Sequence, residues 1–259
     1  MNRTHGTKDF WLGALRTEGP AFRAAVTSAG PDARVPSCPD WAVVDLVRHL
    51  GLTYRWVRSH AGRGVVTAPE RRAADFEGEV AAEFPPWPAA IDWWAAEFDQ
   101  LAEALEALDP ELPAWNWAPQ AKKAGFWHRR MAHETAIHRC DAQLAAGRIE
   151  PVETKLAAEG ISEVLDTWLP AGRRRGPTDR QGVVHLVATD VAQEWYVRLR
   201  GAGLALLDTG TLLDTDDHHT RTLARGTASD LLLALYGRVP FDVLEVAGDT
   251  TLLAALRTG

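Results

Sequence analysis

The 259-residue sequence contains only two cysteines, Cys38 and Cys140, and they lie in different segments. This scarcity excludes a disulfide-stapled secreted scaffold and favours a reducing compartment, so we expect a cytoplasmic protein. No uncharged apolar run is long enough to cross a membrane. The first residues carry charges where a signal peptide would need an apolar core, so secretion is not expected.

Long basic runs are also missing, and the formal net charge is -7 with an isoelectric point near 5.7. This acidic balance argues against nucleic acid as the main partner. The chain has no glycine-rich nucleotide loop in a strand–helix context and no Gly-x-Ser-x-Gly motif, so a serine-hydrolase elbow has no support. We therefore expect small-molecule partners, no nucleic acid and no membrane, and a monomer or small homo-oligomer.

Hydrophobic residues make up 46% of the chain, enough for a substantial core. Apolar residues recur at helical spacing in four segments before residue 150, and the Gly-, Pro- and charge-rich segment 61–88 predicts a long irregular connection or lid. Asp40 is the expected N-cap of the second helix, and Gly147 is expected to close the fourth. The pattern predicts an up-and-down four-helix bundle over residues 1–150, with helices at 8–28, 40–59, 89–108 and 126–146.

The pattern changes after Pro151, where a helical segment over 152–168 precedes a basic, Gly- and Pro-bearing turn at 172–177. Short segments with strand character and two further helices follow. We therefore predict a multidomain chain, α and then α+β, with an α+β domain over 151–259 that begins with a connecting helix. Its expected strands are 183–188, 194–199 and 204–207, and its later helices are 229–236 and 250–256.

The fourth predicted helix carries a carboxylate and an imidazole at metal-ligand spacing. Glu134 and His138 are four residues apart and point the same way, one turn above the other. Asp141 follows on nearly the same face, one turn further along. The pair supplies two ligands of a divalent-metal site, or else it is an exposed ion pair that supports the helix.

The sequence His133-Glu134 invites comparison with zinc proteases, but the spacing excludes that reading. Their motif needs a second histidine four residues after the first. His138 follows His133 by five residues and lies about 140° away around the helix. Glu134 with His138 is therefore the pair that could chelate one ion.

His49, on the second predicted helix, is the candidate third ligand. It lies at the edge of the buried stripe, where a histidine is either a satisfied core residue or a ligand. It becomes a ligand only if the fourth helix packs against the second with Glu134 opposite. The pair His218-His219, which follows Asp214, is either a second metal-binding spot or a solvated turn.

Three stretches of the chain resemble the mycothiol-dependent maleylpyruvate isomerase family of actinobacteria. The resemblance covers nearly the whole chain in order, and the two stretches around the candidate ligands are its most specific part. It implies a DinB-like four-helix bundle followed by a small domain similar to sterol carrier proteins. The stretches are Val35 to Trp41 with Asp45 to Gly51; Arg129 to Glu134 with Ile137 to Ala142; and His185 to Asp190, Gly226 to Leu231, Gly237-Arg238 and Gly248-Asp249.

The resemblance also implies a divalent ion, usually zinc, held by His49, Glu134 and His138. Three protein ligands leave an open position, where a thiol would lose its proton. In the isomerase, the mycothiol thiolate adds to the cis double bond of maleylpyruvate, the bond rotates, and elimination gives fumarylpyruvate. In related bundle enzymes the result is thiol transfer instead.

Two further residues receive candidate catalytic roles. Asp141 would orient a ligand from outside the metal's own shell, or it is an ordinary surface acid. Arg238 would recognise an anionic substrate or cofactor from the C-terminal domain. Our leading hypothesis is a metal-dependent, mycothiol-using isomerase or S-transferase. The alternatives are a non-catalytic protein that binds a thiol or another small ligand, and a metal-assisted hydrolase with water in the open position.

Overall fold

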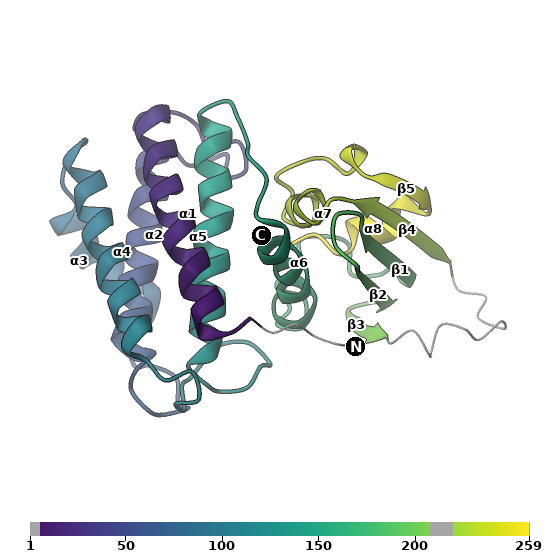
Figure 1. The fold of residues 1–259 in the computed structure, drawn as a ribbon, viewed down its shortest axis with the longest axis horizontal. Helices are drawn as coiled ribbons and strands as arrows, with labels where there is room; N and C mark the ends of the chain where they lie inside the picture. The colour runs from purple at the N-terminus through teal and green to yellow at the C-terminus, as the bar shows by residue number, and fades with distance from the viewer. Residues whose placement is uncertain (1–5, 208–219, 259) are drawn as a thin grey trace. The chain divides into compact units, whose positions relative to one another are not determined.

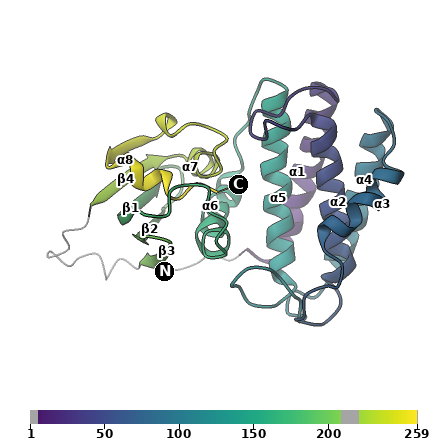
Figure 2. The same ribbon diagram turned by 180° about the vertical axis from the view of Figure 1, so that it is seen from behind.

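The computed structural model describes residues 6–207 and 220–258. The chain divides into two compact units. The bundle unit comprises 6–116 and 121–150, and the sheet unit comprises 117–120 and the described residues from Pro151 onward. Figures 1 and 2 show the long helices of the first and the small sheet of the second. Within the described ranges, no helix is both long and apolar enough to span a membrane.

The bundle unit contains the four predicted long helices, so the fold prediction is confirmed. They begin and end within three residues of the predicted positions. Gly147 follows the last helix with φ 75°, a left-handed conformation that glycine adopts without strain, as expected for a helix terminator. The helices are α1 (Lys8–Ala29), α2 (Val43–His60), α4 (Ala89–Ala107) and α5 (Gly125–Ala145).

The prediction that Asp40 caps the second helix is wrong. Helix α2 begins at Val43, and the carboxylate of Asp45 accepts a hydrogen bond from the Ala42 N–H at 3.1 Å. Asp40 lies in the preceding turn, where Trp41 N–H donates to the Cys38 carbonyl at 2.8 Å. The capping carboxylate therefore reaches back from inside the first helical turn.

The prediction of a wholly irregular connection over 61–88 is also wrong. This segment contains a short 3₁₀ helix, η1 (Ala73–Phe76), followed by α3 (Glu77–Glu83). Phe76 and Val80 are buried and form a small apolar cluster with Leu52 of α2. Contact with α2 therefore orders a segment whose own composition favours a loop.

The four long helices do not follow one another around the bundle in their sequence order. Helix α1 packs mainly against α5 and also against α4, whereas α2 packs mainly against α4 and also against α5. Figures 1 and 2 show α4 and α5 on opposite sides of α1 and α2. The ring order α1–α5–α2–α4 therefore makes the second and fourth long helices neighbours.

Helix α5 is buried around almost its whole circumference although many of its residues are polar. Burying such groups costs free energy unless they find partners. Arg139 shows how the cost is met: its Nε donates to Glu18 Oε2 of α1 at 2.7 Å, and its Nη1 donates to Gln143 and to the Glu150 carbonyl. A buried helix with many polar residues is therefore stabilised by specific pairs.

His60, the last residue of α2, is buried between the rings of Trp56, Trp115 and Trp127. Its Nδ1 donates to the Trp56 carbonyl at 2.7 Å, and its Nε2 has no hydrogen-bond partner among the described residues. Burial lowers the pKa of His60 from 6.5 to about 4, despite the bond to Trp56. The native imidazole is therefore neutral at physiological pH.

This burial predicts a loss of stability in acid. Between pH 6.5 and about pH 4, His60 is protonated in the unfolded chain but neutral in the native protein. The unfolding free energy therefore decreases as the pH is lowered through this window. The full difference is about 3 kcal/mol. We expect His60→Gln to remove this part of the pH slope, as measured by urea unfolding at several pH values. An unchanged slope would contradict the assignment.

The sheet unit begins with α6 (Thr154–Glu163), which continues into a π-helical segment, η2 (Val164–Trp168). The three predicted strands are present, and two more, β4 and β5, were not predicted. The strand order is β3-β2-β1-β4-β5, with β1 and β4 parallel and the other neighbours antiparallel. The strands are β1 (Gln181–Ala188), β2 (Gln193–Arg200), β3 (Gly203–Leu207), β4 (Arg221–Gly226) and β5 (Glu245–Gly248).

Helices cover one face of this sheet. Helices α7 (Ala228–Leu235) and α8 (Thr250–Ala254) contact β1 and β4, α6 packs on α7, and the short 3₁₀ helix η4 (Phe241–Val243) precedes β5. Trp195 of β2 is buried on the helix-covered face and donates through Nε1 to Ser162 of α6 at 3.0 Å. The predicted α+β architecture of this part is confirmed.

Candidate metal centre

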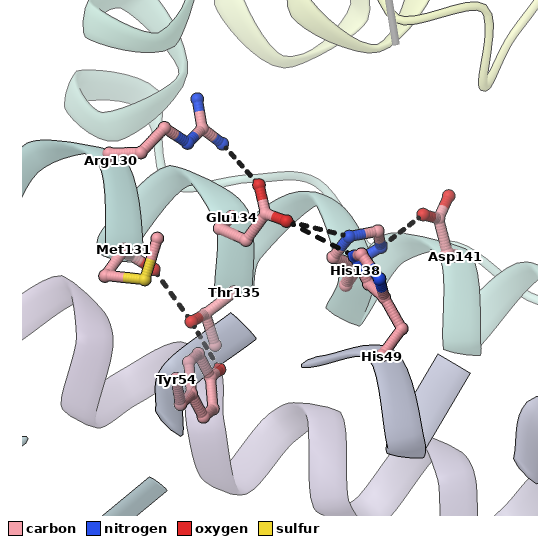
Figure 3. A network of polar contacts seen from close by, with 8 residues as sticks. All are labelled: His49, Tyr54, Arg130, Met131, Glu134, Thr135, His138 and Asp141. Atoms are coloured by element: carbon pink, nitrogen blue, oxygen red, sulfur yellow. Dashed lines mark hydrogen bonds and ion pairs between the residues drawn. The ribbon is translucent and has the colours of Figure 1, made fainter. Parts of the chain in front are cut away.

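Helices α2 and α5 bring three potential metal ligands together (Figure 3). His138 Nε2 lies 3.3 Å from Glu134 Oε1, and His49 Nε2 lies 3.6 Å from the same oxygen. One ligand atom from each residue falls within 4.8 Å of the others. The residue spacing on α5 therefore aligns Glu134 with His138, and the packing of α2 against α5 places His49 beside them.

The other oxygen of Glu134 is held by an arginine on the same helix. Arg130 Nη2 donates to Glu134 Oε2 at 3.0 Å, and the Arg130 side chain is only 3% exposed. Figure 3 shows the guanidinium on the opposite side of the carboxylate from the two imidazoles. Arg130 therefore fixes the carboxylate so that Oε1 faces the histidines.

A second carboxylate fixes the ring of His138. His138 Nδ1 donates to Asp141 Oδ2 at 2.9 Å, and Asp141 is completely buried. Ser37, in the loop before α2, donates through Oγ to Asp141 Oδ1 at 2.6 Å. Because Nδ1 carries the proton, Nε2 is the nitrogen available for a metal, the arrangement typical of histidine ligands.

His49 is supported by ring packing. The ring of Trp41 lies 4.8 Å from the His49 ring, centroid to centroid, and the His138 ring lies 5.1 Å away on edge. The His49 side chain is 35% exposed, against 16% for Glu134 and 11% for His138. The site is therefore most open to solvent at His49.

The protein environment favours the charged forms of Glu134 and His138. Burial opposes ionisation of Glu134, but contacts with His138, His49 and Arg130 outweigh it and hold its pKa well below 4.5. Burial also opposes protonation of His138, but the hydrogen bonds to Asp141 and Glu134 raise its pKa to about 9. A metal ion binding through Nε2 would therefore displace a proton, which couples metal affinity to pH.

The donor set fits a divalent ion. Two imidazole nitrogens and one carboxylate oxygen form a ligand set found in catalytic zinc sites, where the fourth position stays open. The hydrogen-bonded carboxylate behind His138 and the arginine behind Glu134 are the outer contacts that such ligands need. The residues present therefore match the chemistry of a catalytic metal site.

The structure brings His49, Glu134, His138 and Asp141 together, and it leaves His133 outside the cluster. Arg238 belongs to the sheet unit, where its Nη1 donates to the Tyr236 carbonyl at 2.7 Å and its guanidinium lies over the Tyr236 ring. Its assigned role therefore stays a prediction. The candidate pair His218-His219 lies outside the described residues.

Sequence reasoning missed three contributors to the site: Arg130, Ser37 and Trp41. Arg130 precedes Glu134 by four residues, the spacing of a helical ion pair, so a signal for it was present. Ser37 and Trp41 lie in a loop more than eighty residues before α5. No periodicity links such a loop to a distant helix.

The sequence matches the family profile of the mycothiol maleylpyruvate isomerase N-terminal domain over residues 12–143. It matches that family's C-terminal domain over residues 155–255. This chain belongs to the mycothiol-dependent maleylpyruvate isomerase family. It is therefore an enzyme by family, and the predictions of family and of enzymatic character are confirmed.

Two solved structures share this fold. They are mycothiol-dependent maleylpyruvate isomerase and a histidine-to-alanine mutant of it, at 11% and 12% sequence identity. Each comparison covers 93% of both chains with a TM-score of 0.61. A search of curated protein sequences finds no match to this chain. At such low identity, the structural likeness establishes the fold alone.

Proposed function

We propose that this enzyme uses a divalent metal, most simply Zn²⁺, to activate mycothiol or a related small thiol for attack on an electrophile. The reaction we favour is cis–trans isomerisation of a maleylpyruvate-like substrate. The observation that carries the proposal is the convergence of His49, Glu134 and His138 within 4.8 Å, with the carboxylate of Asp141 behind His138. Membership of the family supports the thiol and the isomerase chemistry.

Each residue has a distinct task in this proposal. A divalent ion held by His49, Glu134 and His138 would lower the pKa of a thiol in its open position, which makes the thiolate available at neutral pH. Arg130 orients Glu134, and Asp141 keeps the proton of His138 on Nδ1. The thiol and substrate would approach beside His49, where the cluster is most exposed.

Several finer assignments belong to this proposal. Arg238, whose guanidinium is oriented by the Tyr236 carbonyl and ring, would recognise a substrate or cofactor carboxylate. S-transfer is the alternative outcome for the same thiolate when the electrophile carries a leaving group. We place the enzyme in the cytoplasm, with a small-molecule electrophile and a thiol as its partners.

The proposal is tested by metal analysis and product analysis of the full-length protein purified without chelator. We expect one equivalent of divalent metal and conversion of maleylpyruvate to its trans isomer that requires mycothiol. Chelation should abolish the conversion, and added Zn²⁺ should restore it. Protein that takes up no divalent metal would overturn the proposal. Hydrolysis without added thiol would favour the metal-assisted hydrolase instead.

A further inference from the structure

The loop at residues 35–41, before α2, contacts His49 directly and contacts Asp141, the hydrogen-bond partner of His138. On one side, Ser37 donates to Asp141, which in turn accepts from His138 Nδ1. On the other, the ring of Trp41 lies against the ring of His49. We propose that this loop positions both imidazole ligands, with Ser37 and Trp41 as positioning residues; this inference rests on the proposed metal site.

The loop is built to hold these two side chains in place. Val35 N–H donates to the Trp41 carbonyl at 3.1 Å, which closes the loop at its two ends. Inside it, Cys38 N–H donates to the Val35 carbonyl at 3.0 Å. Val35 itself is completely buried and anchors the loop in the core of the bundle unit. Ser37 and Trp41 therefore project from a backbone that its own hydrogen bonds constrain.

Ser37 acts on His138 through a buried carboxylate. Asp141 is completely buried, so each of its oxygens needs a donor to offset the loss of hydration. The Ser37 hydroxyl serves Oδ1, and His138 Nδ1 is bonded to Oδ2. Loss of the hydroxyl would remove one of the hydrogen bonds that fix this carboxylate, and the orientation of the His138 ring would loosen with it.

Trp41 acts on His49 by packing. Among the contacts of the described residues, His49 meets the Glu134 carboxylate through Nε2, and no hydrogen bond at Nδ1 fixes the ring from its other side. Its half-exposed position leaves the ring free to turn unless neighbouring rings restrain it. Trp41 and His138 supply that restraint. One loop thus holds one ligand by a hydrogen-bond chain and the other by ring contact.

The test measures Co²⁺ binding to the metal-free full-length protein, by competition with a chelator and by the visible spectrum of the bound ion. We expect Ser37→Ala to weaken Co²⁺ binding by roughly 10-fold, the lower range for residues that orient a ligand. Ser37→Thr keeps a hydroxyl and should bind close to wild type. Trp41→Leu should also weaken Co²⁺ binding by roughly 10-fold and should shift the visible bands of the bound ion. Trp41→Phe keeps an aromatic ring and should retain the wild-type affinity and spectrum.

Ser59→Ala is the matched control, because Ser59 is an exposed residue of α2 whose hydroxyl donates to the Trp56 carbonyl. Thermal unfolding of each metal-free variant checks that the fold is kept, and Trp41→Leu tests the loop independently if Ser37→Ala does not fold. Wild-type protein that takes up no Co²⁺ would overturn both the metal site and this inference. Wild-type affinity in Ser37→Ala and Trp41→Leu would overturn the loop's role alone.

Discussion

Glu134→Gln is expected to remove divalent metal from the purified enzyme and to abolish its thiol-dependent activity. Glu134 is the anionic member of the cluster, and its Oε1 faces both His49 and His138. A neutral amide cannot replace that charge, and it weakens the buried ion pair with Arg130 that holds the other carboxylate oxygen. We expect metal affinity to fall by more than about 100-fold, the upper range for residues that merely orient a ligand.

Metal analysis and Co²⁺ titration of the variant measure this effect. Glu79→Gln is the matched control, because Glu79 is 54% exposed and pairs with Arg71 on the surface. The control should keep wild-type metal content and turnover. A Glu134→Gln enzyme with unchanged metal affinity would remove Glu134 from the site.

Glu18→Ala should produce the largest loss of stability that we expect from a residue outside the candidate site. Glu18 and Arg139 form an ion pair at 2.7 Å between α1 and α5, with side chains 6% and 4% exposed. Removing one partner leaves the other charge buried, which costs about 3–5 kcal/mol. Urea unfolding followed by tryptophan fluorescence measures the change in the unfolding free energy.

Glu106→Ala is the control for this change, because Glu106 pairs with Arg16 of the same helix α1 at 2.7 Å but is 59% exposed. An exposed pair contributes at most about 1 kcal/mol. The double variant Glu18→Leu/Arg139→Met should be more stable than Glu18→Ala, since it leaves no buried guanidinium that has lost the Glu18 carboxylate. Equal losses in Glu18→Ala and Glu106→Ala would show that burial does not govern this pair.

The parts of the fold that the sequence predicted are those with local periodicity. The four long helices carry apolar residues at helical spacing, β1 and β2 carry β-branched or aromatic residues, and β3 is a short apolar run of leucine and alanine. Strands β4 and β5 are four to six residues long and contain charged residues and glycine. They are strands because β1 and β4 offer them partners, which is a tertiary cause.

The candidate site divides in the same way. Glu134, His138 and Asp141 lie on one helix, so their common face follows from the helical repeat. The loop residues Ser37 and Trp41 have no such relation to α5, and only folding brings them to it. Asp40 was wrongly assigned as a cap because Asp45, inside the first turn of α2, competes for the same role.

The sequence by itself determined that a carboxylate and an imidazole stack on the fourth long helix, because the spacing of residues on a helix is a local property. It could not decide whether His49 joins them. In a bundle whose neighbours are consecutive in sequence, the second and fourth helices would occupy opposite corners. The observed ring order α1–α5–α2–α4 makes α2 and α5 neighbours instead. Helix packing is set by apolar faces and by buried pairs such as Glu18 with Arg139. This packing therefore places His49 beside Glu134 and His138 as the third potential ligand.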